Sequence, residues 1–113
     1  MKYEEIINEV KSLYPSEYDE SQMTDWINEL EGNISIYRGD IPCKIQSLSD
    51  ETSVSAPFDR MYTDFVMAQI SLHQHDDEAY ARYINMFNAR YTTWKGYYMS
   101  VREGEKHQYK NWI

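Results

Sequence analysis

Apolar side chains recur at helical spacing in the first part of the chain, in two short groups separated by a turn. The first helix is expected to end before Pro15, because a proline ring disrupts the hydrogen bonding of a helix. Ser16 or Asp19 can cap the second helix, which we expect to end at Gly32. The apolar positions are Tyr3, Ile6, Ile7, Val10, Leu13 and Tyr14 in the first helix, and Met23, Trp26, Ile27 and Leu30 in the second. Residues 1–32 are therefore predicted to form a helical hairpin.

No helical period continues through residues 33–55, and this stretch is predicted to be a long irregular loop. It contains Gly39, Pro42 and five serines, with a brief strand-like alternation at Ile34 and Ile36. A loop of more than about 15 residues in a small domain usually has a function or is disordered. This loop is too apolar for simple disorder, so we expect it to pack against another surface. Its apolar residues are Ile34, Ile36, Ile41, Ile45, Leu48 and Val54.

The next stretch, residues 56–103, is predicted to form two long helices. Pro57 suits the first turn of the earlier helix, where a backbone N–H is not needed. The polar turn "HQHDDEAY" leads into the later helix, which Asp76 or Asp77 can cap. We expect the later helix to end at Gly104. One face of the earlier helix carries Phe58, Met61, Tyr62, Phe65, Ala68, Gln69 and Leu72.

The last predicted helix is rich in aromatic side chains. Two rows at seven-residue spacing form a coiled-coil-like seam, and further apolar residues lie beyond it. The rows are Tyr80, Phe87, Trp94 and Val101, and Ile84, Tyr91 and Tyr98, while Tyr83, Met86 and Tyr97 lie outside them. From Asp77 to Arg102 the helix would measure about 39 Å at about 1.5 Å per residue, whereas a compact chain of this size is about 34 Å across. Aromatic surface on an overhanging helix usually meets another subunit.

Length and charge narrow the class of protein. The 113 residues fit one domain, 1–113, and the patterns predict an all-α bundle of about four helices with a polar tail over 104–113. The net charge is −8, and residues 1–32, with two lysines and nine acidic residues, contribute −7 of it. Tight binding to a phosphate backbone requires clustered Lys and Arg, so gripping of nucleic acid is not expected. No apolar run approaches 18 residues, so no transmembrane helix is expected.

No arrangement of residues typical of an active site is found in the sequence. His73, His75 and the two aspartates after them are the best candidates for metal ligands. Residues two apart point to different faces of a helix, and we interpret this stretch as a polar turn. Cys43 is the only cysteine and has no histidine near it in the sequence. We therefore expect a protein that is not an enzyme and has no metal site and no cofactor.

The segment "SAPFDRMYTDFVMAQISLHQHDDEAYARYINMFNARYTTWKGYYMSVREGE" resembles the C-terminal half of small head–tail connector, or adaptor, proteins of tailed bacteriophages and prophages of Firmicutes. The resemblance covers about residues 54–103. The matching positions are Pro57, Phe58, Asp59, Met61 and Tyr62, then Phe87, Asn88, Ala89, Tyr91 and a later aromatic–Tyr pair. The chain departs from the family at His73 and His75, where small or acidic turn residues are more usual, and in its longer tail.

The resemblance implies a non-enzymatic virion protein. Such proteins are α-helical and form a ring of about a dozen copies beneath the portal protein, which extends the DNA channel and offers a platform to a tail-completion or tail-tube protein. DNA passes through such a ring without sequence-specific binding. The implied location is the neck of the virion, and the host cytoplasm during assembly, with no membrane.

Two groups of residues are candidates for partner contacts on this interpretation. An over-long helix needs a neighbour, and a ring built head-to-tail needs two different adhesive faces on each copy. The candidates for subunit or partner contacts are Tyr83, Met86, Tyr97, Tyr98 and Trp112. The candidates for the loop that docks on the portal are Ile36, Tyr37, Arg38, Ile41 and Ile45.

Other classes of function remain open at this point. The main alternative is a small acidic intracellular regulator or inhibitor that binds one host protein. A nucleic-acid binder would stack bases on the aromatic stripe, with Arg82, Arg90 and Lys95 supplying charge. An enzyme with a metal centre at His73 and His75 is the remaining alternative.

Overall fold

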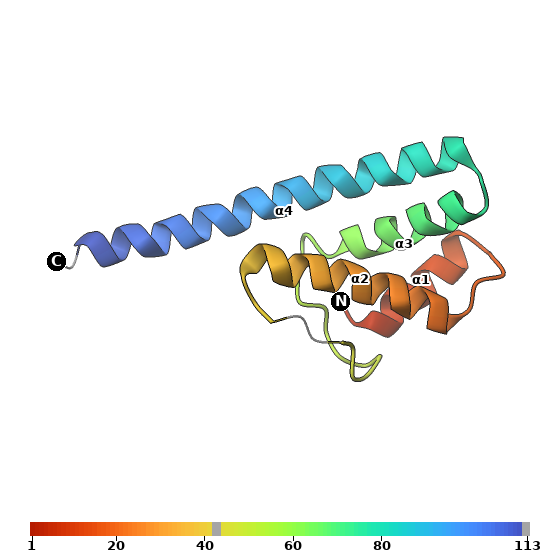
Figure 1. The fold of residues 1–113 in the computed structure, drawn as a ribbon, viewed down its shortest axis with the longest axis horizontal. Coiled ribbons are helices and arrows are strands. Elements are labelled where there is room, and N and C mark those ends of the chain that lie inside the picture. The colour runs from red at the N-terminus through yellow and green to blue at the C-terminus, as the bar shows by residue number, and fades with distance from the viewer. Residues whose placement is uncertain (42–43, 112–113) are drawn as a thin grey trace.

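The protein forms four α-helices in a computed structural model, which describes the backbone of residues 1–41 and 44–111 and side chains as far as Gly104. The helices are α1 (Tyr3–Leu13), α2 (Glu20–Arg38), α3 (Arg60–His73) and α4 (Asp77–Asn111) (Figure 1). Within these residues the only β-type pairing is an isolated bridge between Lys2 and Glu51. The prediction of an all-α fold with a long loop between the second and third helices is confirmed.

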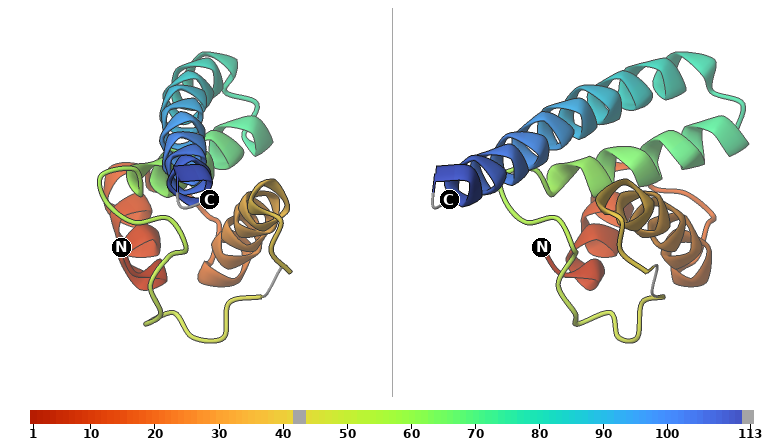
Figure 2. Two further views of the ribbon diagram at one scale, coloured as in Figure 1. Left: turned by 90° about the vertical axis from the view of Figure 1, so that its left-hand side faces the viewer. Right: turned by 60° about the vertical axis from the view of Figure 1, so that its left-hand side comes forward.

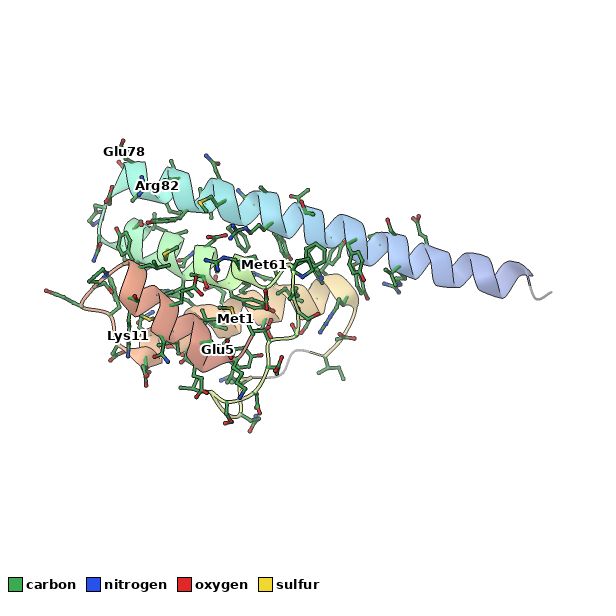
Figure 3. The ribbon with its side chains drawn as sticks, turned by 180° about the vertical axis from the view of Figure 1, so that it is seen from behind. Met1, Glu5, Lys11, Met61, Glu78 and Arg82 are labelled. Carbon is green, nitrogen blue, oxygen red and sulfur yellow. The ribbon has the colours of Figure 1, made fainter. Side chains whose placement is uncertain are left out.

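Helix α3 lies at the centre of the molecule, with α4 on one side and α1 and α2 on the other (Figures 1 and 2). Every residue of α3 from 61 to 68 is buried, and Met61 lies in the interior between the helices (Figure 3). The most deeply buried apolar side chains are Ile6, Ile7, Val10, Met23, Ile27, Ile34, Met61, Tyr62, Val66 and Ile70. These residues come from α1, α2 and α3, so the three helices share one core.

The first turn of α1 is capped by the second half of the loop between α2 and α3. No side chain caps this helix. Instead, the Glu4 amide donates to the Leu48 carbonyl at 2.9 Å, and the Thr52 amide donates to the Met1 carbonyl at 2.8 Å. Backbone groups at a helix start need such partners, so this half of the loop is a fixed part of the fold.

Helix α2 is longer than the sequence pattern indicates. Asp19 caps it as expected, since its Oδ1 accepts from the Gln22 amide at 2.9 Å, but Gly32 does not end it. The helix continues to Arg38, and Gly39 at φ 83° ends it. A glycine inside a helix costs about 1 kcal/mol, whereas burial of Ile34 returns about 2 kcal/mol. The expected loop boundary at residue 33, and the strand-like alternation there, were wrong.

The ends of α3 and α4 also differ from expectation. Helix α3 begins at Arg60, and Pro57 lies in the turn that precedes it. Asp76 caps α4, with its Oδ1 accepting from the Ala79 amide at 3.1 Å. Gly104 does not end α4, which continues to Asn111 and takes in most of the expected tail. Good helix formers on both sides of Gly104, such as glutamate and lysine, outweigh the cost of this one glycine.

The extra length of α4 gives the molecule its shape. At about 1.5 Å per residue the helix is about 52 Å long, and the molecule measures 58 × 31 × 20 Å. The C-terminal part of α4 projects past the other three helices (Figure 1). Among the described residues, no helix is both long enough and apolar enough to span a membrane.

Candidate interaction surface

A column of four aromatic rings runs along the inward face of α4. Phe87, Tyr91, Trp94 and Tyr98 stack in sequence, with ring centroids 5.3, 5.9 and 5.6 Å apart. Residues three and four apart lie on one face of a helix, so the sequence spacing produces the column directly. Phe87 and Trp94 are buried, and Tyr91 and Tyr98 are half-buried.

The column joins α4 to two other helices. On α3, the Phe65 ring lies 5.2 Å from that of Phe87. At the end of α2, the Tyr37 ring lies 5.7 Å from Trp94 and 5.9 Å from Tyr98. The inner side of the seam therefore packs within one copy of the chain. The predicted second row, Ile84, Tyr91 and Tyr98, is half-buried and packs against the core.

Two basic side chains of α4 support this junction. The Lys95 ammonium lies 4.7 Å from the Tyr91 ring centroid and 5.4 Å from that of Tyr37, within the range of a cation–π contact. The Arg90 guanidinium lies 2.5 Å from a carboxylate oxygen of Asp64 on α3. Burial raises the pKa of the Asp64 carboxyl, and the charge of Arg90 opposes that rise.

The candidate contact residues at the start of α4 differ in exposure. Tyr83 is half-buried, with its ring edge-on to Tyr14 at 5.7 Å and the guanidinium of Arg82 above it at 5.0 Å. Met86 is exposed. Part of the Tyr83 ring is therefore covered by the residue that follows α1, whereas the Met86 side chain can contact a partner.

The candidates near the overhang form the edge of a hollow. Tyr97 is 57% exposed, and its ring lies 5.1 Å from Phe58. Tyr98 is half-buried against the aromatic column. The hollow has a volume of about 390 Å³ and is lined by Arg38, residues 53–58, Trp94, Tyr97 and Tyr98. Trp112, the remaining candidate, lies outside the described residues.

The candidate docking-loop residues are divided between a helix and a loop. Ile36, Tyr37 and Arg38 belong to the last turn of α2, not to the loop. Ile41 is 86% exposed, and Ile45 is half-buried, with its amide donating to Asn28 Oδ1 at 2.9 Å. Of the five, Ile36 and Ile41 are the most exposed.

A buried carboxylate that the sequence pattern did not reveal holds the loop to the helices. Glu31 accepts hydrogen bonds from the hydroxyls of Tyr3, at 2.6 Å, and Tyr62, at 2.5 Å. It also accepts from the Ser53 amide at 3.0 Å and hydroxyl at 2.8 Å. Glu31 lies four residues after Ile27 and three before Ile34, on the apolar face of the helix. A carboxylate on an apolar face was the one sign in the sequence that this residue is buried.

The two histidines lie at the end of α3 and in the turn that follows it. The His73 Nδ1 lies 2.8 Å from the Gln69 carbonyl oxygen, and its ring lies 5.3 Å from that of Trp26. His75 has a positive φ of 59° in the turn. Over the part of the chain that the structure describes, no three His, Cys, Asp or Glu side chains are grouped as metal ligands.

Eight large apolar side chains of the described residues are exposed, and five of them lie near the projecting end of α4 or the end of α2: Ile36, Ile41, Tyr97, Met99 and Val101. The other three are Leu13, Leu72 and Met86. Comparison of the chain with protein-family models, with curated proteins and with solved structures finds no match.

Proposed function

We propose that the protein is a head–tail connector subunit of a tailed bacteriophage or prophage, which assembles into a ring of about a dozen copies beneath the portal protein. The observation that carries the proposal is the projecting end of α4. There α4 carries three exposed apolar side chains, Tyr97, Met99 and Val101, at 57, 41 and 45% exposure. Tyr97 and Val101 are four residues apart and share one face of the helix, whereas Met99 lies on another face. Large apolar side chains left exposed at a projecting helix are typical of a surface that meets a partner.

The charge of the chain is compatible with a channel for DNA. A net charge of −8 repels phosphate, and every Lys or Arg contact to the backbone would add to binding. A wall that repels DNA lets it slide. The long loop supports docking, because Ile41 near its start is 86% exposed, whereas its second half is bonded to α1 and Glu31.

Native mass spectrometry over a concentration series, with negative-stain images of large species, tests the proposal. A ring of about a dozen copies is the expected result, either alone or when the portal protein of the same phage is added as a template. A protein that stays monomeric and does not bind the portal contradicts the proposal.

A second candidate function rests on the acidic surface of the first two helices. Residues 1–32 carry −7, and Glu4, Glu17, Asp25 and Glu29 are exposed, so this side of the molecule suits a basic protein partner. A regulator or inhibitor would form a compact one-to-one complex with a host protein. Recovery of such a complex, without ring formation or portal binding, would favour this function.

A further inference from the structure

One end of the molecule is strongly acidic. There the turn between α1 and α2 meets the turn between α3 and α4, and the Tyr18 ring lies 6.1 Å from that of His73. Glu78 lies at this end, opposite the projecting part of α4 (Figure 3). Residues 13–20 and 72–79 contain six acidic residues and no Lys or Arg. We call these two segments the turn end.

Three carboxylates of the turn end are unused within the subunit. They are exposed and make no side-chain hydrogen bond or ion pair with any residue that the structure describes; they are Glu17, Asp77 and Glu78. The two cations that border this end have partners of their own. Lys11 pairs with Glu20, and the Arg82 guanidinium lies over the Tyr83 ring. The turn end therefore presents an excess of negative charge to a neighbour.

The opposite end carries positive charge. Residues 36–44 and 95–104 contain four basic residues and two acidic ones, and we call these segments the overhang end. They meet where the Tyr37 hydroxyl donates to the Lys95 carbonyl at 3.4 Å. Arg102 is exposed and has no ion pair with a described residue, whereas the Arg38 Nε lies 2.9 Å from a carboxylate oxygen of Asp40. A chain with a net charge of −8 thus has two ends of opposite charge.

The overhang end also contains the aromatic hollow. Tyr97 and Tyr98 line it from α4, and Arg38 borders it. Its volume of about 390 Å³ lies within the range of protein binding pockets, so it can accept an apolar side chain. The turn end offers two such side chains, Leu13 and Leu72, which are 57 and 46% exposed. The two ends are therefore complementary in charge, and one offers apolar side chains to the hollow of the other.

We propose that the turn end of one copy docks on the overhang end of a second copy of this chain. The free carboxylates of the turn end then face Arg38 and Arg102, and Leu72 enters the aromatic hollow. The two surfaces differ, so the contact is head-to-tail and each copy keeps one free surface for the next. This inference rests on the proposed function, because it names the contact that joins the copies of the ring.

Complementary charge reversal tests the contact. D77K/E78K reverses the turn end and R38E/R102E reverses the overhang end. Each variant is expected to weaken self-association by about tenfold or more, because like charges then face one another. In an equimolar mixture, a reversed turn end meets a reversed overhang end, and the two unchanged ends meet as in the wild type. Sedimentation velocity should show that this mixture assembles as wild type does, and that added salt weakens the wild-type assembly.

Matched controls separate the contact from net charge. E4K/E5K makes the same change in charge as D77K/E78K, also at exposed positions in the first turn of a helix. K2E/N8E/Q46E changes the net charge by as much as R38E/R102E, at exposed positions outside both ends. Both controls should assemble normally, and circular dichroism should show that all four variants fold.

A further variant tests the apolar part of the contact. Leu72→Ser removes the side chain that enters the hollow and should also weaken self-association. Because Leu72 is exposed, the melting temperature of the variant should stay within a few degrees of the wild-type value. Assembly of Leu72→Ser at wild-type strength would contradict the role given to the hollow.

Several other results would overturn the inference. One is assembly of both charge variants at wild-type strength, which would leave the ring proposal standing with a different contact. Another is failure of the mixture to assemble when the controls do. A third is wild-type protein that stays monomeric alone yet binds the portal, which removes this contact and keeps the connector function. Open filaments that the charge variants abolish would instead support the contact and contradict the ring.

Discussion

Glu31 is the residue on which the largest number of separate segments depends. Its carboxylate accepts from Tyr3 on α1, from Tyr62 on α3 and from Ser53 in the loop, while Glu31 itself belongs to α2. A buried carboxylate is stable only when its oxygens are fully hydrogen-bonded. Here the phenols and the serine satisfy that need, and in return the loop is fixed against three helices.

Removal of this carboxylate should cost a large part of the stability. We predict that Glu31→Ala lowers the free energy of unfolding by about 3 kcal/mol, because the buried donors on Tyr3, Tyr62 and Ser53 lose their acceptor. Urea denaturation below the concentration of assembly measures this value. Glu29→Ala, on the exposed side of the same helix, should change it by less than about 0.5 kcal/mol. Equal effects of the two substitutions would contradict the role given to Glu31.

The same site should make the fold sensitive to alkali. Burial and the neighbouring Glu31 carboxylate raise the pKa of the Tyr3 and Tyr62 phenols above the ordinary value of 10.0. In the unfolded chain both phenols lose their protons near pH 10, whereas the folded protein retains them. The stabilisation is therefore complete below pH 10 and falls as the pH rises further.

Thermal unfolding at pH 8 to 11 measures this effect. The melting temperature should fall above pH 10, and the fall should be shallower in Tyr62→Phe, which has no phenol to ionise at that position. The same slope in the variant and the wild type would rule out this origin.

At the scale of the element, a glycine at the end of a helix and a glycine inside one have opposite effects on stability. Gly39 ends α2 at a φ of 83°, which other residues adopt at a cost, whereas Gly96 lies inside α4 with open space around the position of a Cβ. We predict that Gly39→Ala destabilises the fold by about 1 kcal/mol. Gly96→Ala should stabilise it by up to about 1 kcal/mol. Denaturant midpoints of the pair measure both, and effects of the same sign would contradict the assignment.

The sequence predicted helix boundaries better where a proline or a side-chain cap marks them than where a glycine was expected to mark them. Pro15 lacks a backbone N–H and its ring disrupts a helix, and Asp19 and Asp76 cap helices with their side chains. The structure confirms that α1 ends before Pro15 and that the two aspartates are caps. Gly32 and Gly104 are only weak signals, because a glycine costs a helix about 1 kcal/mol. Neighbouring contacts can outweigh that amount, and at Gly32 the burial of Ile34 does so.

The candidate contact residues were only partly separable from core residues by sequence. The seven-residue rows identified Trp94 as core, and it is buried. Tyr98 lies in the second seven-residue row and was a candidate contact residue, yet it is half-buried. Helix α2 continues to Arg38 and brings the Tyr37 ring against it. That contact depends on the last turn of α2, which was not expected to be helical because Gly32 was expected to end the helix. The roles of Glu31 and Tyr37 therefore required the three-dimensional structure.

Trp94 is buried and Tyr97 is exposed, and this difference gives a test of which aromatic rings stabilise the subunit. Trp94→Ala should lower the free energy of unfolding by about 3–5 kcal/mol, since it empties the middle of the aromatic column. Tyr97→Ala, at a ring mostly exposed, should change it by less than about 1 kcal/mol and instead weaken self-association. Differential scanning calorimetry and sedimentation measure the two effects, and a large loss of stability in Tyr97→Ala would contradict the division.

At the scale of the whole molecule, the projecting end of α4 should be dispensable for folding. A chain that stops at Ser100 keeps the aromatic column and the shared core, because Val101 to Gly104 are exposed. We predict that its melting temperature stays within a few degrees of that of the full chain while self-association is lost. Thermal unfolding and native mass spectrometry test this pair of outcomes. A strong fall in melting temperature would mean that the projection supports the body.

The long helix also acts as a lever arm. The distance from Tyr98, whose ring contacts Tyr37 at the end of α2, to Asn111 is about 20 Å. A tilt of about 5° at that contact moves the tip by about 2 Å, which is enough to change which side chains meet at the far end. Small volume changes at Phe65 or Phe87 would thereby alter the curvature of an assembly without touching any residue at the contact between copies.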